Sequence, residues 1–144
     1  MISQLTVFME NEKGRLAAVC RALADADINL HALVLADTAD FGVLRLLCDT
    51  PEAAAEALRA QGWRAAVTPV LAVRIPNVPG SLASLLEFLD EKDVSVEYAY
   101  CFSMAGDVVY DILKVDDEET VATLLVEGGF ALVSPEDVYE VDAT

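Results

Sequence analysis

The stretch NEKGRL at residues 11–16 decides the fold, because it returns as NVPGSL at residues 77–82. Both stretches follow a run of alternating apolar residues, and both place a glycine directly before an apolar pattern with helical spacing. Outward from these stretches, the two halves of the chain align at a constant offset of 66 residues, which later becomes 67. A repeat that fills the chain indicates a duplicated small domain, with predicted boundaries 1–69 and 70–144.

Each half predicts the same order of elements. Apolar periodicity and turn residues in the first half indicate a strand at 3–9, a helix at 15–26, strands at 28–36 and 41–48, a helix between Pro51 and Gly62, and a strand at 63–68. The second half indicates a strand at 70–75, a helix at 80–92, strands at 94–103 and 107–115, a helix at 117–127, and a strand at 130–134. The order βαββαβ, found twice, predicts an α+β protein of two tandem ferredoxin-like domains, with antiparallel sheets and helices on one face.

The charge of the chain limits the classes of partner. It has 144 residues with 9 basic and 25 acidic side chains, a net charge of −16. So negative a surface repels nucleic-acid phosphates and anionic lipids, which argues against both as partners. The sequence has no apolar run near the roughly 18–20 residues of a membrane span and no secretory signal pattern, so we expect a cytoplasmic protein. The charge is uneven, because residues 1–70 carry 6 basic and 9 acidic side chains and residues 71–144 carry 3 and 16.

Residues suited to catalysis or metal binding are scarce. The three cysteines, Cys20, Cys48 and Cys101, have neither disulfide-framework nor CxxC spacing, and His31 is the single histidine. We interpret the cysteines as small core residues. We therefore expect no catalytic residues, no metal site and no cofactor, and predict that the protein is not an enzyme.

Two further groups of residues have structural interpretations. The carboxylate run at 116–119 begins a predicted helix, where the helix dipole favours negative charge, so we interpret it as a helix start rather than a metal site. Five aromatic residues are interpreted as packing the sheets and the contacts between domains: Phe41, Trp63, Tyr98, Tyr100 and Phe130.

The junction of the first strand and first helix in each half can hold a small anionic group. Gly14 and Gly80 come directly before their helices, where unpaired backbone N–H groups favour a carboxylate. Asn11 and Asn77 open the two turns, and Asn29 begins the strand expected beside the first turn. An amide offers both a donor and an acceptor, which suits the ammonium and carboxylate groups of an amino acid. Asparagine is also a common turn former, so a purely structural role is the alternative.

These residues resemble the ACT domain, a small-molecule-sensing module of amino-acid metabolism, once in each half. The resemblance rests on the repeated turn, on the helix end ALADADIN at 22–29, and on the closing glycine–aromatic pairs Gly62-Trp63 and Gly129-Phe130. The segment ADTADFGVLR at 36–45 is similar to stand-alone proteins made of two ACT domains and no enzyme. The resemblance implies an amino acid bound near the strand–helix turn, at an interface between two ACT units.

The resemblance also implies which residues bind. Asparagines in the turn and at the start of the second strand would contact the ligand; Asn11 and Asn29 match both, whereas the second half has Asn77 but Ser95. Lys13 stands where the family usually has proline, yet we favour the first-half site. The candidate ligand-binding residues are Asn11, Lys13, Gly14, Arg15, Leu16, Asn29, Asn77, Pro79, Gly80, Ser81 and Leu82.

The sequence therefore predicts a non-catalytic regulatory protein that binds an amino acid between ACT units and acts as a homodimer. An enzyme of amino-acid metabolism is the predicted partner that responds to the bound state. The alternative is a structural or protein-interaction module without a working ligand site. The turn recognises groups that all amino acids share, so the sequence does not name the ligand.

Overall fold

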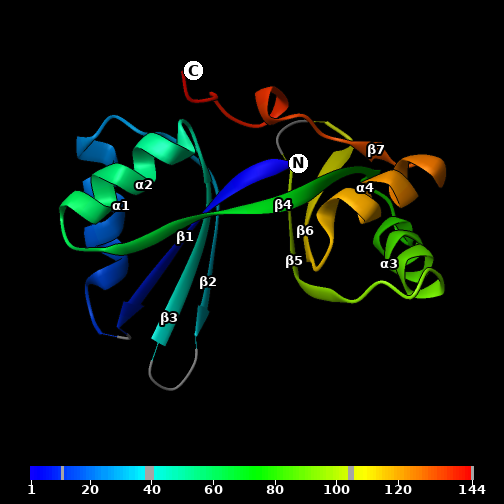
Figure 1. The fold of residues 1–144 in the computed structure, drawn as a ribbon, viewed down its shortest axis with the longest axis horizontal. Coiled ribbons are helices and arrows are strands. Elements are labelled where there is room, and N and C mark those ends of the chain that lie inside the picture. Colours follow the sequence, from blue (N-terminus) through cyan, green and yellow to red (C-terminus); the bar gives the residue numbers. More distant parts are fainter. Residues whose placement is uncertain (11, 38–40, 104–105, 144) are drawn as a thin grey trace. The chain divides into compact units, whose positions relative to one another are not determined.

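The computed structural model describes residues 1–10, 12–37, 41–103 and 106–143 (Figure 1). Its contacts divide the chain into two compact units, each built around one repeat. The first unit, as we name it, comprises Ser3–Thr68 and Pro135–Thr144, and the second comprises Pro69–Ser134 and Met1–Ile2. Residues 135–143 thus pack with the first repeat, although they follow the second.

The first unit is a four-stranded sheet with two helices on one face (Figure 1). Its elements are β1 (Ile2–Glu10), α1 (Arg15–Asp25), β2 (Leu30–Asp37), β3 (Phe41–Cys48), α2 (Pro51–Ala60) and the first part of β4 (Arg64–Pro76). The strands lie in the order β2-β3-β1-β4, and β3 pairs antiparallel with both β1 and β2.

The second unit repeats this plan. Its elements are the second part of β4, α3 (Ser81–Glu91), β5 (Val96–Phe102), β6 (Val108–Val115), α4 (Glu118–Glu127) and β7 (Ala131–Leu132). The short 3₁₀ helix η1 (Pro135–Asp137) follows β7 and belongs to the first unit. The strands lie in the order β7-β4-β6-β5 and pair antiparallel. The predicted fold class, two tandem ferredoxin-like βαββαβ domains, is confirmed.

Two predicted strand limits are wrong. The strands predicted at 63–68 and 70–75 are one strand of 13 residues, β4, which continues through Pro69 because an extended backbone tolerates the fixed φ of proline. The strand predicted at 130–134 is only the two-residue β7. One further N–H, from Val133, donates to the carbonyl of Ala72 at 2.8 Å, and Pro135 then begins η1, since proline has no N–H with which to extend the pairing.

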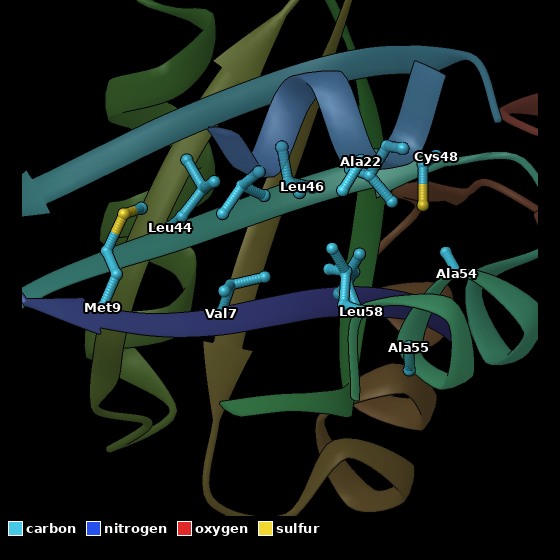
Figure 2. Packing of buried hydrophobic residues seen from close by; sticks show 12 residues of the cluster. Val7, Met9, Ala22, Leu44, Leu46, Cys48, Ala54, Ala55 and Leu58 are labelled. Carbon is cyan, nitrogen blue, oxygen red and sulfur yellow. The ribbon is translucent and has the colours of Figure 1, made fainter. Parts of the chain in front are cut away.

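The core of the first unit lies between its sheet and its helices (Figure 2). Alternate residues of β1 and β3 point at the helices, as the period of a strand requires. The buried side chains include Leu5, Val7, Met9, Val19, Leu23, Leu44, Leu46, Cys48, Ala54, Ala55 and Leu58. Burial, helped by the nearby Asp49 and Asp142, raises the pKa of the Cys48 thiol to about 12, so this cysteine is an inert core residue as expected.

The core interpretation is wrong for Cys101, which is exposed. Cys101 lies on β5, the strand at the end of the second sheet, and pairs with Asp111 of β6. Its thiol donates a hydrogen bond to Oδ1 of Asp111 at 3.2 Å. An edge strand leaves its side chains accessible even on the face that carries the helices.

The end of the chain caps helix α2. Thr50, the residue before the helix, has a left-handed backbone (φ 44°) and makes no side-chain cap. The carboxylate of Asp142 instead accepts hydrogen bonds from the backbone N–H groups of Glu52 and Ala53, at 3.0 Å each. A residue some 90 positions along the chain therefore satisfies the first turn of this helix.

Further contacts hold the same C-terminal segment on the first unit. The buried Tyr139 hydroxyl accepts a hydrogen bond from the backbone N–H of Ser3 at 2.8 Å. The N–H of Glu140 donates to Oδ1 of Asp49 at 2.6 Å, and the same oxygen lies 2.8 Å from Nε2 of His31. Burial opposes ionisation of Asp49, but these hydrogen bonds outweigh it and lower its pKa from the ordinary 3.8.

Candidate functional site

The corner where β1 passes into α1 is open and polar. Gly14, directly before α1, has φ +87°, a left-handed conformation that favours glycine. An added Cβ there would meet nothing within 4 Å, so glycine is required by the backbone angle and not by crowding. Among the described residues no side chain caps α1; the N–H of Arg15 donates to the carbonyl of Glu12 at 3.4 Å, and the following N–H groups of the first turn are available to a ligand.

A hollow of about 300 Å³ lies at this corner. This volume is at the lower end for small-molecule sites and suits one small ligand. The hollow is lined by residues from the C-terminal end of β1, the first residue of β3, the start of α1, and the turn that leads into β4: Phe8, Met9, Glu10, Arg15, Phe41, Gly62, Trp63 and Arg64.

The sheet register brings the strand residues of the hollow together. Glu10 pairs with Phe41 across β1 and β3, and pairing partners point to the same face of a sheet. Phe8 lies two residues before Glu10 and so shares that face, opposite the core residue Met9. The site is therefore assembled at one end of the sheet, from residues far apart in the sequence.

Both signs of charge meet at the hollow. Nη2 of Arg15 lies 3.3 Å from Oε2 of Glu10 and 3.5 Å from Oε2 of Glu12, and its guanidinium lies 5.7 Å from the ring centre of Trp63. The guanidinium of Arg64 lies 5.7 Å from the ring centre of Phe8. These ion pairs are solvent-exposed and contribute little stability, so their consequence is placement of charge.

The predicted first-half residues take different positions around this corner. Arg15 lines the hollow, and Leu16 packs against the core of the first unit. Gly14 and Lys13 are exposed in the turn. Asn11 lies outside the described residues.

Asn29 lies at the opposite end of the sheet from the hollow. The next residue, Leu30, pairs with Cys48 at the end of β3, whereas Glu10 pairs with Phe41 at its start. Seven residues of strand separate these pairs, about 23 Å at the usual rise per residue. The expectation that Asn29 begins a strand beside its own turn is therefore wrong within one unit, where its backbone carbonyl accepts a hydrogen bond from the N–H of Asp49 at 3.0 Å.

The second-half candidates form a similar turn. Gly80 has φ +91°, and the backbone N–H of Asn77 donates to the carbonyl of Asp107 at 2.7 Å. Asn77, Pro79 and Gly80 are exposed, Ser81 is half-buried and Leu82 is 39% exposed.

The second corner lacks the charged groups of the first. By the repeat offset, Glu10 corresponds to Pro76, Arg15 to Ser81 and Arg64 to Ala131. The strand pairing supports this alignment, because Pro76 pairs with Val108 as Glu10 pairs with Phe41. The same turn geometry is thus kept, while the equivalents of Glu10, Arg15 and Arg64 are uncharged; Arg74 and Asn77 are polar groups that remain near this corner among the described residues.

Two residues of the hollow were assigned only packing roles from the sequence. Phe41 is 56% exposed, and Trp63 lines the hollow while also packing on the core. A usable signal lies in the repeat, because a position needed for packing alone should be similar in both halves. Phe41 instead corresponds to Val108 in the second repeat, and this difference indicates a role that is specific to the first unit.

The second unit contains one unusual buried acid. Asp111 is fully buried on β6. Its Oδ1 accepts a hydrogen bond from the Cys101 thiol, whereas its Oδ2 has no hydrogen-bond partner among the described residues. Burial raises the pKa of Asp111, and burial together with this carboxyl raises the pKa of Cys101 to about 12. Among the described residues, His, Cys, Asp and Glu side chains do not gather in groups of three that could hold a metal ion.

None of the helices in the described part of the chain combines the length and the apolar character that a membrane span requires.

Comparison with known proteins gives a family and several similar folds. The model of the family described as ACT domain pair matches residues 1–141. The crystal structure of protein BT0572 from Bacteroides thetaiotaomicron has a TM-score of 0.88 and 36% sequence identity over 94% of each chain. The ligand-free regulatory subunit of aspartate kinase from Thermus thermophilus has a TM-score of 0.65 and 18% identity, over 88% of this chain and 91% of that one. The corresponding subunit from Thermus flavus has a TM-score of 0.61 and 17% identity, over 88% and 90%. At these low identities the two kinase subunits show the fold alone, and no curated protein matches the chain.

Proposed function

Because the chain belongs to the ACT domain pair family, we propose that it is a non-catalytic regulatory protein that binds an amino acid at the corner of β1 and α1. ACT domains are regulatory domains, and similar folds include regulatory subunits of aspartate kinase. The ligand would shift the protein toward one arrangement of its homodimer, and an enzyme of amino-acid metabolism would respond to that arrangement.

The observation that carries this proposal is the pair of opposite charges at the hollow. Arg15 and Arg64 provide guanidinium groups for a carboxylate, and the open first turn of α1 adds backbone N–H groups. Glu10 provides a carboxylate for an ammonium group on the same side of the sheet. A zwitterionic amino acid satisfies both kinds of group at once.

Asn29 joins this site only through a second ACT unit. Since it lies about 23 Å from the hollow along its own sheet, any contact with the ligand comes from another copy. We propose that a homodimer brings Asn29 of one copy to the corner of the other. The second-unit corner, with Asn77, Pro79, Gly80, Ser81 and Leu82, is proposed as a degenerate site.

A thermal-shift screen against the twenty amino acids tests the proposal. A ligand present at a hundredfold excess over its dissociation constant adds about 2.7 kcal/mol to the free energy of unfolding, and the melting temperature rises as a result. Arg15→Ser, which installs the second-unit residue, should abolish the shift. Arg21→Ser is the matched control, because Arg21 lies on the same helix, is 76% exposed and pairs only with Asp25 among its described contacts.

Failure of every amino acid to shift the melting temperature would favour the structural or protein-interaction module instead. Asn29→Ala separates the two parts of the proposal. Loss of the shift in this variant supports a site shared between copies, and an unchanged shift places the whole site within one unit.

A further inference from the structure

We infer that the amino acid bound at this hollow carries an aromatic side chain. The inference rests on the proposed function and adds the ligand class. It follows from the composition of the wall, because three of the eight residues that line the hollow are aromatic, namely Phe8, Phe41 and Trp63.

Two of these rings, those of Phe8 and Phe41, are partly exposed to solvent. Phe8 is 41% exposed and Phe41 is 56% exposed, and both lie on the sheet face opposite the core. Exposed apolar area costs roughly 25 cal/mol for each Å² that could have been buried. Two neighbouring, partly exposed rings that line one hollow form an apolar patch of the kind that marks a binding surface.

The second repeat shows that the fold does not need these rings. At the positions equivalent to Phe8 and Phe41 it has Arg74 and Val108, and it still forms the same paired strands. The residue equivalent to Trp63 is Phe130, whose ring packs against that of Phe88 with the ring centres 5.1 Å apart. The combination of Phe8, Phe41 and Trp63 is thus a property of the first corner. The second unit instead has a ring pair on neighbouring strands, Phe102 and Tyr110, with Arg74 lying 5.7 Å from the ring centre of Tyr110.

The charges fix how an aromatic amino acid would lie. Its carboxylate meets the guanidinium of Arg15, which uses only Nη2 in its two ion pairs and retains other donors. Its ammonium meets Glu10, whose strand partner is Phe41. The ligand ring then lies on the exposed face formed by Phe8 and Phe41, where offset or edge-to-face ring contacts add about 0.5–1.5 kcal/mol to burial.

The single tryptophan of the chain provides the measurement. Trp63 lines the hollow, so a ligand bound there changes its fluorescence, and isothermal titration calorimetry gives the affinity independently. The ligands are L-phenylalanine, L-leucine, L-aspartate and glycine. We expect L-phenylalanine to bind at least tenfold more tightly than L-leucine and to change the emission of Trp63.

Three variants locate the selectivity. Phe41→Val, the second-repeat residue, should weaken L-phenylalanine at least tenfold and L-leucine less than threefold, whereas Phe41→Tyr keeps the ring and should bind like the parent. Leu33→Val is the matched control, because Leu33 is 41% exposed on β2 away from the hollow.

The outcomes distinguish the inference from the function on which it rests. Equal or tighter binding of leucine, aspartate or glycine overturns the aromatic inference and leaves amino-acid binding in place. Absence of heat and of a fluorescence change with every amino acid overturns both. Loss of L-phenylalanine binding in Leu33→Val as well as in Phe41→Val would also overturn the inference, since the effect would not belong to the ring.

Discussion

The two units share one fold but differ at three equivalent places. At the strand–helix corner the first unit has Glu10, Arg15 and Phe41, and the second has Pro76, Ser81 and Val108. The turn itself is the same in both, with a glycine at φ +87° or +91°. The two repeats thus share the backbone geometry of the turn and differ in the side chains around it, so the fold does not depend on the charged and aromatic groups of the first corner.

The second helices of the two units are capped by different means. In α4 the preceding residue, Asp117, accepts hydrogen bonds from the backbone N–H of Thr120 at 3.2 Å and from its hydroxyl at 2.7 Å. These bonds lower the pKa of Asp117 below its ordinary value. In α2 the cap is Asp142, which arrives from the end of the chain. One helix start is local and the other depends on a segment that folds back.

The third difference is a core position. Leu44 of β3 is fully buried in the first unit, and its equivalent in β6 is Asp111, also fully buried. The second unit therefore carries a polar group where the first has ordinary apolar packing.

Exchange of this core position should give the largest effect. Leu44→Asp loses a buried side chain and buries a carboxyl, so we expect a loss of about 5 kcal/mol from the free energy of unfolding. Asp111→Leu should stabilise the second unit by about 1–3 kcal/mol at pH 7, because a buried acid with an unpaired oxygen is replaced by packing. Urea denaturation measures both changes.

The pH dependence sharpens this prediction. Because the pKa of Asp111 is raised in the folded protein, folding favours its protonated form. As pH rises above the ordinary 3.8, the carboxyl ionises in the unfolded chain first, and the free energy of unfolding falls. The gain from Asp111→Leu should therefore be smaller at pH 4 than at pH 7. A gain that grows toward low pH contradicts this account, and Asp116→Leu, at an exposed position, is the control.

Removal of the two helix caps should have intermediate effects. Asp117→Ala removes a local cap and should cost about 1 kcal/mol. Asp142→Ala removes two hydrogen bonds to the first turn of α2 and loosens the C-terminal segment, so we expect about 2 kcal/mol. Hydrogen exchange should show the loss of protection at α2 for Asp142→Ala and at α4 for Asp117→Ala; equal protection at α2 in both variants would show that the segment contributes nothing.

The smallest difference between the two units is expected at the turn glycines. Gly14→Ala and Gly80→Ala each force a side chain into the left-handed region, at a cost of about 1–2 kcal/mol. Both sites have open space around the missing Cβ, so the two costs should agree within about 0.5 kcal/mol in thermal unfolding. A clearly larger loss at Gly14 would mean that the two corners are not equivalent in backbone geometry.

Most of the fold could be predicted because its helices and strands follow from patterns among neighbouring residues. Alternation in β1 and β3 and the helical spacing in α1 are readable from neighbouring residues, and the repeat supplied each unit with an independent copy. The ends of β4 and β7 were missed because Pro69 and Pro135 have opposite consequences: the extended strand accepts the first, and the second ends the pairing. Those consequences depend on which backbone groups face a partner strand.

The candidate site was predicted only in part. Gly14 and Arg15 were recognisable from the turn, since glycine and a helix start have local signatures. Phe41 and Trp63 were assigned to packing, because exposure of a ring is not visible in the sequence. Asn29 was placed beside its own turn, and the strand register moved it to the other end of the sheet.

The sequence by itself determined that this protein is a duplicated βαββαβ chain with two equivalent glycine turns, and that its acidic charge lies mainly in the second half. Tertiary structure decided which residues meet: Phe8, Arg15, Phe41 and Trp63 around one hollow, and Asp142 at the start of α2. The physical reason is range. Turns, periodicity and charge are set by neighbours along the chain, whereas the lining of the hollow arises from strand register and the distant helix cap from a segment that folds back.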